Sequence, residues 1–263
     1  MAPMICVASD LHGASDDLRK AVPEGATLLL LGDLINFLDY STMTGILCEV
    51  FSPEPVRRVA ELRAEGKLDE ARRLIRERSA GREDEVRQQI GEKVVRQYQE
   101  VFETLPDPTY LILGNVDRPE LASSFADQNP GVHLADGEVH ELEGERFGFV
   151  GGALPTQLNV GGEVTPEEIR AKLESFGEVD VLCTHIPPAV PELCYDNLAR
   201  HEEEGSEDIL EYIHDVGPRL HYFGHVHQPL LSSMYVGRTL CINVGYFRAT
   251  KRAWPHASLH EPG

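Results

Sequence analysis

Residues 4–13 of the chain read MICVASDLHG. The first six of these residues form an apolar, strand-like run, and Asp10 and His12 follow where that run ends. Apolar runs of this length are typical of strands that are buried on both faces of a sheet. Because ligands bind at the carboxyl ends of the strands in open α/β sheets, this stretch predicts a first strand that delivers two metal-capable side chains to one site.

Further strand and helix patterns alternate along the chain. Apolar runs predict buried strands at residues 27–32, 109–114, 147–151, 179–184 and 220–224. Amphipathic or well-capped segments predict helices at residues 15–21, 119–127, 166–176 and 206–215. Two runs split by Gly237 and Arg238 predict a closing hairpin, at residues 231–236 and 239–244. This order of elements predicts an α/β layered fold built on mixed sheets.

Residues 51–105 interrupt that alternation. The segment is rich in Arg, Glu, Ala and Leu, and its apolar residues recur at spacings of three and four, with breaks near Gly66 and Gly81. Such spacing predicts amphipathic helices. We expect a single domain over residues 1–263 with a helical insertion at about 51–105. The insertion packs either over the main domain or against a second subunit of a homodimer.

The bulk composition is that of an ordinary globular protein. Hydrophobic residues make up 41% and charged residues 26% of the chain, and no apolar run approaches the roughly 20 residues of a membrane span. No basic region precedes the first apolar run, and the five cysteines form no CxxC pair, so we expect a cytoplasmic protein with buried free thiols. The formal net charge of −20 disfavours long nucleic acids, which bind through phosphate neutralisation by Lys and Arg.

Metal-capable side chains follow nearly every predicted strand. Each position alone has an ordinary explanation, such as a helix cap at Asp10 or a turn at Asp33. The pair His225 and His227 is more informative, because residues two positions apart in an extended segment project to the same side. In this order and at these strand ends, the motifs together indicate one site, formed by Asp10-Leu11-His12, Gly32-Asp33, Gly114-Asn115, His185 and Gly224-His225-Val226-His227.

This set of motifs resembles the calcineurin-like metallophosphoesterase superfamily, whose pattern is DxH, GD, GN, a lone His and GHxH. The resemblance spans most of the chain. It implies a four-layer α-β-β-α sandwich, in which two facing mixed β-sheets lie between helical layers. It also implies two metal ions that share one carboxylate.

Seven side chains would bind these metals if the resemblance is transferred position by position. One metal would be held by Asp10, His12 and His227. The other metal would be held by Asn115, His185 and His225. Asp33 would bridge the two.

The ligand types suit hydrolysis of a phosphate ester. Mixed nitrogen and oxygen ligands fit Mn, Fe or Zn better than Ca or Mg, which favour oxygen ligands. Two cations about 3.5–4 Å apart lower the pKa of a bridging water, so that hydroxide forms near neutral pH and attacks phosphorus in line. The candidate catalytic residues are Asp33, Asn115 and Asn36, of which Asn36 either reaches the phosphate or a metal-bound water or serves the loop structure.

One position departs from the pattern that this resemblance implies. Members of the superfamily often carry a His after the Asn of the GN motif, where it is thought to assist the leaving group, and this chain has Val116 there. Loss of general acid assistance costs about 10²–10⁴-fold on poor leaving groups. We therefore expect faster hydrolysis of activated diesters than of alkyl monoesters. Among the neighbouring residues, Asp117 either orients a ligand or caps the helix near Pro119, and we favour the cap. We expect Asn243 to form a turn.

The leading prediction is a phosphodiesterase acting on small organic or nucleotide-like phosphates. One alternative is a phosphomonoesterase or nucleotide pyrophosphatase, and another is a catalytically weak, metal-bound scaffold whose insertion binds a protein partner. A nuclease would need the arginines of the insertion to form one basic patch beside the site. We expect them instead to pair with acidic residues at helical spacing. They are Arg57, Arg58, Arg63, Arg72, Arg73, Arg76 and Arg78.

Overall fold

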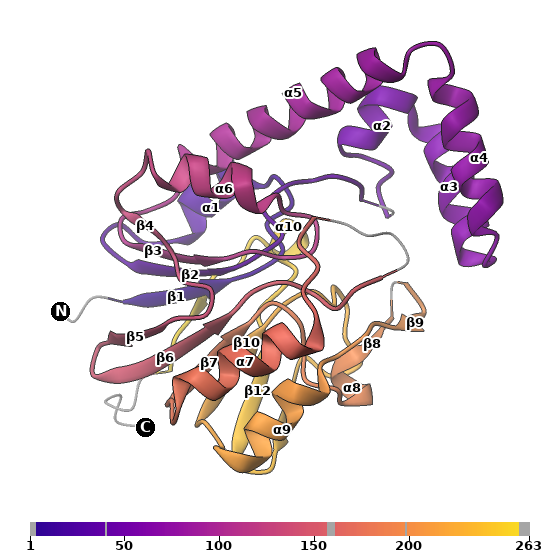
Figure 1. Cartoon of the computed structure of the whole chain (residues 1–263). Helices are drawn as coiled ribbons and strands as arrows, with labels where there is room; N and C mark the ends of the chain where they lie inside the picture. Colours follow the sequence, from indigo (N-terminus) through magenta and orange to yellow (C-terminus); the bar gives the residue numbers. More distant parts are fainter. Residues whose placement is uncertain (1–3, 40, 157–160, 198, 258–263) are drawn as a thin grey trace.

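The first of two large sheets contains the strand that opens the chain. A computed structural model describes residues 4–39, 41–156, 161–197 and 199–257 (Figure 1). Four strands of this sheet are parallel and the fifth, from the C-terminal region, is antiparallel to β1. In spatial order they are β13 (Trp254–Pro255), β1 (Ile5–Ala8), β2 (Thr27–Leu31), β3 (Thr109–Ile112) and β4 (Val132–Leu134).

The second large sheet contains six strands and is also mixed. Its central strands are parallel, whereas β11 and β5 are antiparallel to the neighbours that they pair with at the two edges. The predicted closing hairpin is confirmed as the β11–β12 pair. In spatial order the strands are β11 (Ser233–Val236), β12 (Thr239–Asn243), β10 (Leu220–Phe223), β7 (Val181–Thr184), β6 (Glu145–Val150) and β5 (Val139–Leu142).

Alternate side chains of the central strands enter different cores. On β1, Ile5 and Val7 lie in the core between the two sheets, whereas Cys6 and Ala8 lie in the core under the first helical layer. This follows from the period of two in a strand, and it explains why the sequence of a strand buried on both faces is continuously apolar. A third core lies between the second sheet and the opposite helices. The predicted four-layer α-β-β-α sandwich is therefore confirmed (Figure 1).

Helices cover the outer face of each sheet. The first sheet is covered by α1 (Ser15–Ala21), α6 (Pro119–Ala126) and part of α5 (Glu83–Phe102), and the second by α7 (Pro166–Phe176) and α9 (Glu207–Asp215). The helices predicted at residues 166–176 and 206–215 are confirmed. Thr165 and Glu168 form a reciprocal capping box at α7, and the Ser206 hydroxyl accepts the N–H of Ile209 at α9.

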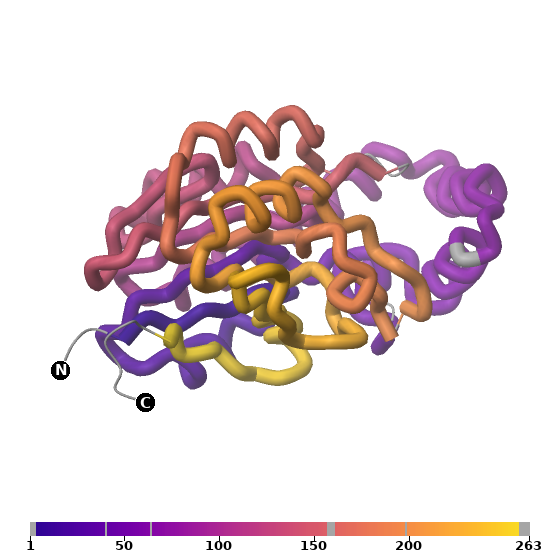
Figure 2. The backbone as a smooth tube through the Cα atoms, turned by 90° about the horizontal axis from the view of Figure 1, so that it is seen from below, coloured from indigo at the N-terminus to yellow at the C-terminus, as the bar shows by residue number. Residues whose placement is uncertain are grey.

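The segment at 51–105 is helical, as the spacing predicts. It contains α3 (Pro53–Ala64), α4 (Leu68–Ser79) and α5, preceded by α2 (Ile46–Phe51), and turns at Gly66 and Gly81 separate the last three helices. The α3–α4 pair stands away from the two sheets (Figures 1 and 2). In contrast, the second half of α5 is part of the main core, where Tyr98 and Val101 are fully buried. The single-domain organisation stays a prediction.

Several short elements were not anticipated in the sequence. They include α8 (Pro191–Cys194), the β8–β9 hairpin (Tyr195–Asp196 with His201–Glu202) and α10 (Phe247–Thr250). All five cysteines are free and buried, as expected. Among the described residues, no helix combines the length and the apolar character that crossing a bilayer requires.

Candidate metal centre

Loops from both sheets meet at one place. They follow β1, β2, β3, β7 and β10, and they carry the seven predicted metal ligands. Backbone hydrogen bonds tie the first two loops together, because the amides of Asp10 and His12 donate to the carbonyls of Gly32 and Asp33 at 3.0 and 2.8 Å. The backbone φ angles of Asp10, His12, Asp33 and His225 are positive, at 58°, 41°, 55° and 67°. Non-glycine residues adopt this conformation in only a few per cent of cases, although Asp and His tolerate it better than most.

The first group of side chains lies around His12. The Nε2 atom of His12 is 3.1 Å from Nε2 of His227 and 3.6 Å from Oδ2 of Asp33. Asp10 completes the group, and one ligand atom from each of the four side chains lies within 4.8 Å of the others. These four residues are those that the resemblance assigns to the first metal and its bridge.

The second group lies around Asn115. Its side-chain oxygen is 3.2 Å from Nε2 of His185 and 3.1 Å from Nδ1 of His225. Nε2 of His185 is also 3.6 Å from Oδ1 of Asp33, and Asp33, His185 and His225 meet the same 4.8 Å criterion. Asp33 is therefore common to both groups and presents a different carboxylate oxygen to each.

Hydrogen bonds to backbone carbonyls outside the ligand groups, here called outer hydrogen bonds, determine which histidine nitrogen faces the centre. Nδ1 of His12 is 3.2 Å from the Ile35 carbonyl, and Nδ1 of His185 is 2.7 Å from the Leu31 carbonyl. A carbonyl only accepts, so in the neutral imidazoles the N–H lies on Nδ1 and Nε2 presents a lone pair. The lone pair of His12 then faces the Asp33 carboxylate, another acceptor. A cation between them satisfies this arrangement of acceptors.

Burial keeps several of these imidazoles in the metal-binding, neutral form. It lowers the pKa of His225 to about 3 and that of His227 to about 4, and it also lowers the pKa of His12 despite the opposing charge of Asp33. Burial and the charge of Asp33 raise the pKa of Asp10 well above its usual value. Two carboxylates buried this close together gain from bound cations, which neutralise their mutual repulsion.

Asp117 connects the loops after β2 and β3. Its carboxylate accepts the backbone N–H groups of Asp33, Leu34 and Gly114 at 2.9, 3.0 and 2.8 Å, and the Tyr98 hydroxyl at 3.3 Å. Our expectation that Asp117 caps the following helix is wrong, because α6 begins after Arg118 and has no side-chain cap. Burial and the charge of the nearby Asp33 raise the pKa of Asp117 to about 7, although these backbone hydrogen bonds lower it.

Glycines allow the loops to approach this closely. A Cβ atom at Gly114 would collide with Oδ1 of Asp33, and one at Gly224 would collide with the Ser9 hydroxyl. The glycine that precedes each ligand in the GN and GHxH motifs therefore has a steric cause. Gly162, which the sequence analysis did not single out, also packs against this loop. Its N–H donates to the Asn115 carbonyl at 3.2 Å, and a Cβ atom at this position would collide with the Gly114 carbonyl.

The remaining predicted residues occupy different surroundings. Asn36 is buried, its N–H donates to Gln97 at 2.7 Å, and its side-chain oxygen lies near Gly45. Among the described residues, no hydrogen bond or ion pair joins Asn36 to the seven candidate ligands, and its catalytic role stays a prediction. The Asn243 side chain donates to the Val226 carbonyl at 2.9 Å and accepts the Gly245 N–H at 2.9 Å, so it joins the closing turn to the GHxH loop.

Three residues beside the centre were missed in the sequence. The Asp196 carboxylate accepts the backbone N–H of His227 at 3.0 Å. Glu203 lies 3.9 Å from Nε2 of His225, whereas Asn115 lies beside Nδ1 of the same ring. The Tyr246 ring is stacked on His227 with centroids 4.0 Å apart. Each comes from a segment whose position depends on tertiary packing, and their spacing in the sequence carried no signal.

The donor set fits two transition-metal ions. Imidazole nitrogens and carboxylate or amide oxygens stand in two groups with one shared carboxylate. Imidazole suits Fe and Zn, and carboxylate and amide oxygens suit Mn. The outer hydrogen bonds of His12 and His185 are those that orient histidine ligands in metal sites.

Comparison with known proteins agrees with this geometry. The family model of the calcineurin-like phosphoesterases matches residues 3–229. One similar solved crystal structure covers 94% of this chain and 92% of its own, with 15% identity and a TM-score of 0.57. The crystal structure of TT1561 of Thermus thermophilus covers 97% and 99%, with 12% identity and a TM-score of 0.53.

These low identities show the fold alone, and no curated protein sequence matches the chain. The family model, in contrast, covers most of the sequence and includes all seven candidate ligands. The chain belongs to the calcineurin-like phosphoesterase family.

Proposed function

We propose that this chain is a dinuclear-metal-dependent phosphodiesterase that acts on small organic phosphates. One observation carries the proposal: the two oxygens of Asp33 face two different ligand groups, at 3.6 Å from His12 and 3.6 Å from His185. Membership of a phosphoesterase family supports a hydrolase. The metals, when bound, neutralise charge on the phosphoryl oxygens and lower the pKa of a bound water.

The residues of the chain supply position and charge. Two hydrogen bonds hold Asp33 in place. Its Oδ1 accepts the N–H of Val116 at 3.1 Å, and its own backbone N–H donates to the Asp117 carboxylate. The buried carboxylates of Asp10 and Asp33 add negative charge that favours cations at the centre. A rigid arrangement of this kind requires little reorganisation when charge develops on the substrate.

Val116 supports diesters with good leaving groups as substrates. Its backbone N–H donates to the Asp33 carboxylate, whereas its isopropyl side chain has no acidic proton to donate to a departing alkoxide. A nitrophenolate leaves without protonation, but a simple alkoxide depends on a general acid. We therefore expect activated diesters to react faster than alkyl monoesters.

At least four of the seven arginines of the insertion pair with acidic residues of their own helices, which does not favour a nucleic-acid substrate. Arg57 and Arg58 pair with Glu54 and Glu61 at 2.7 and 2.9 Å, and two further pairs, of Arg72 with Asp69 and Arg73 with Glu77, have distances of 3.7 Å. All four pairs have helical spacing, as expected from the sequence. Together with the net charge of −20, this pairing supports a small substrate over a polyanion.

Hydrolysis of bis-nitrophenyl phosphate in Mn²⁺ tests the proposal. Wild type should turn over the diester only with metal, and Asp33→Ala should lose that activity. Asp215→Ala is the matched control, because Asp215 is exposed at the end of α9. No metal-dependent turnover by a wild-type protein that binds two metals would overturn the proposal in favour of a scaffold. Faster turnover of an alkyl monoester would favour a phosphomonoesterase.

A further inference from the structure

Residues 247–248, outside the region that the family model matches, lie against the loop that carries Asp10 and His12. At the start of α10, the N–H of Phe247 donates to the Ser9 carbonyl at 3.0 Å and the N–H of Arg248 donates to the Asp10 carbonyl at 3.1 Å. These bonds attach the short helix to the backbone that carries two candidate ligands.

The Arg248 side chain extends this attachment. Its Nη1 donates to the His12 carbonyl at 2.7 Å, so residues 247–248 contact three carbonyls of the loop at residues 9–12. Its Nε donates to Oδ2 of Asp39 at 3.3 Å, and its Nη2 donates to the Thr44 hydroxyl at 3.2 Å. The fixed geometry of a guanidinium thereby joins the His12 loop to the loop that follows Asp33.

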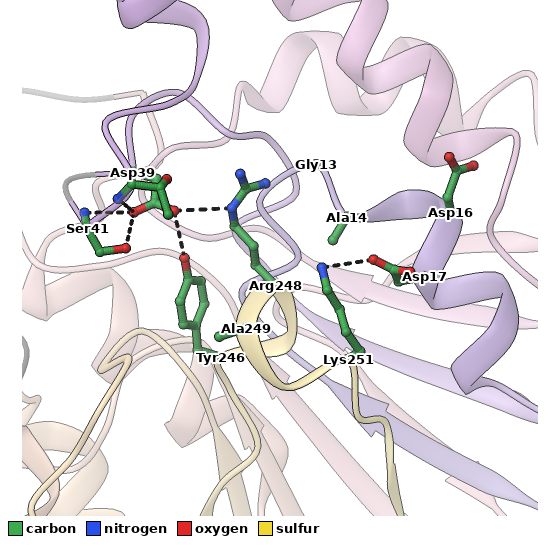
Figure 3. Close-up of a pocket in the computed structure, with 11 residues that line it drawn as sticks. Gly13, Ala14, Asp16, Asp17, Asp39, Ser41, Tyr246, Arg248, Ala249 and Lys251 are labelled. Carbon is green, nitrogen blue, oxygen red and sulfur yellow. Dashed lines mark hydrogen bonds and ion pairs between the residues drawn. The ribbon is translucent and has the colours of Figure 1, made fainter. Parts of the chain in front are cut away.

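Tyr246 contacts the imidazoles of the first ligand group. Its ring is stacked on His227, with centroids 4.0 Å apart and planes 5° apart, and it meets His12 edge to face with centroids 5.7 Å apart. Its hydroxyl donates to Oδ2 of Asp39 at 3.3 Å (Figure 3). One aromatic ring thus restricts the rotation of both histidines, while Asp39 fixes the ring.

Asp39 is a preorganised acceptor for both residues. Its other oxygen, Oδ1, accepts the N–H and hydroxyl of Ser41 at 2.8 and 2.6 Å and the N–H of Thr42 at 3.2 Å. Burial alone would raise the pKa of Asp39, but these hydrogen bonds outweigh burial and hold the pKa below its usual value. The carboxylate is therefore ionised when it binds Tyr246 and Arg248.

A pocket of about 460 Å³ opens beside these three residues (Figure 3). Its two basic side chains, Arg248 and Lys251, are already paired with Asp39 and with Asp17 at 3.3 and 2.9 Å. A pocket for the substrate phosphate would offer cations to the ligand, whereas these are paired within the protein. The contacts of this cluster point to the histidine ligands instead.

We infer that Asp39, Tyr246 and Arg248 are positioning residues that set the affinity of the first metal site, formed by Asp10, His12 and His227. The inference rests on the proposed dinuclear centre. Residues that orient metal-bound imidazoles typically change metal affinity by about 10–100-fold when they are replaced. Among the described residues, no hydrogen bond, ion pair or ring contact joins Asn115, His185 or His225 to this cluster, so the affinity of the second site should stay unchanged.

Calorimetric titration of metal-free protein with Mn²⁺ tests this inference without an activity assay. His12→Ala and His185→Ala identify which binding step belongs to which site. Tyr246→Leu and Arg248→Met should each weaken the first site by about 10-fold or more and leave the second unchanged. Tyr246→Phe, which retains the stacked ring and loses only the hydroxyl, should fall between wild type and Tyr246→Leu.

Tyr212→Leu is the matched control. Tyr212 is 8% exposed, Tyr246 is 7% exposed, and the Tyr212 hydroxyl donates to the Gly177 carbonyl in the opposite helical layer. The control should lower thermal stability and leave both metal affinities unchanged. The inference would be overturned if folded Arg248→Met and Tyr246→Phe lost metal affinity equally at both sites. It would also be overturned if neither variant bound metal more weakly than wild type at the first site. A wild-type protein that binds fewer than two metals would instead refute the proposed centre.

Discussion

The Asp117 carboxylate accepts the backbone N–H of Asp33 at 2.9 Å, although 84 residues separate the two in the sequence. Together with the N–H groups of Leu34 and Gly114, this bond fixes the loops after β2 and β3 relative to each other. The proposed bridging carboxylate is thus placed by a second, fully buried carboxylate that lies behind it.

Replacing Asp117 should weaken the centre without removing a ligand. Asp117→Asn has one acceptor oxygen in place of two, so at least one buried backbone N–H loses its partner, at about 1–3 kcal/mol. We expect a lower thermal midpoint and about 10–100-fold weaker Mn²⁺ binding by calorimetry. Asp127→Asn, at an exposed position after α6, is the control. Wild-type metal affinity in Asp117→Asn would refute the positioning role of Asp117.

The Gly114 position allows a steric test. In Gly114→Ala the new methyl group would collide with Oδ1 of Asp33, so we expect loss of metal-dependent diester hydrolysis. Gly91→Ala is the matched control, because the space around Gly91 in α5 is open and alanine favours a helix by up to about 1 kcal/mol. It should retain activity and gain stability. Full activity in Gly114→Ala would show that the loops do not approach as described.

The main elements of the fold were predictable because they depend on local pattern. The strand that ends at Ala8 has a continuous apolar run, and the helix that begins at Pro166 has apolar periodicity and a proline at its first position. Neither signal needs tertiary information. The positions of the seven candidate ligands were also predictable, since metal-capable side chains recur at the ends of strands and match the motifs of the family that the chain resembles, while their metal-binding role stays a prediction. Their common location confirms that the predicted motifs meet.

The supporting residues could not be predicted, because their partners are distant in the sequence. Tyr246 and His227 are 19 positions apart in different loops, and neither residue indicates the stacking. Asp117 has the local signature of a helix cap, but bonds to Asp33 and Leu34 hold it elsewhere. Likewise, the apolar spacing of α5 allowed packing over the main domain or against a second subunit, and it gave no indication that Tyr98 contacts Asp117.

Introducing an imidazole after Asn115 should change the preference for leaving groups. Val116→His adds the proton donor that the family pattern often has, so hydrolysis of an alkyl monoester should increase, by at most about 10²–10⁴-fold. Nitrophenyl diesters should change much less. The measurement is kcat/KM for glycerol phosphate and for bis-nitrophenyl phosphate, with Val116→Gln as the control without a titrating group. An equal effect of His and Gln would contradict general acid assistance.

Stability should decrease in mild acid through His221. Its ring is fully buried, Nε2 lies 2.8 Å from the Thr184 hydroxyl, and Nδ1 has no hydrogen-bond partner among the described residues. Burial lowers the pKa of His221 to about 3, below about 6.5 in the unfolded chain. The unfolded state therefore binds more protons between these values, and the free energy of unfolding falls as pH falls from about 6.5 towards 3.

The change is measured by denaturant unfolding of wild type and His221→Leu between pH 7 and pH 5. The stability of wild type should fall more steeply, by about 1.4 kcal/mol per pH unit below pH 6.5. Comparison of the two proteins cancels the titration that they share at the metal centre. Parallel pH profiles would show that His221 does not remain neutral in the folded protein.

The number of metals bound when Asp33 is removed tests the central claim most directly. Asp33 faces His12 with one oxygen and His185 with the other, so the account predicts two Mn²⁺ per wild-type chain and weakened binding at both sites in Asp33→Ala. Calorimetric titration of the metal-free proteins measures this, with Asp215→Ala as the control. Two metals bound by Asp33→Ala with wild-type affinity, or weakening at one site alone, would contradict a shared carboxylate.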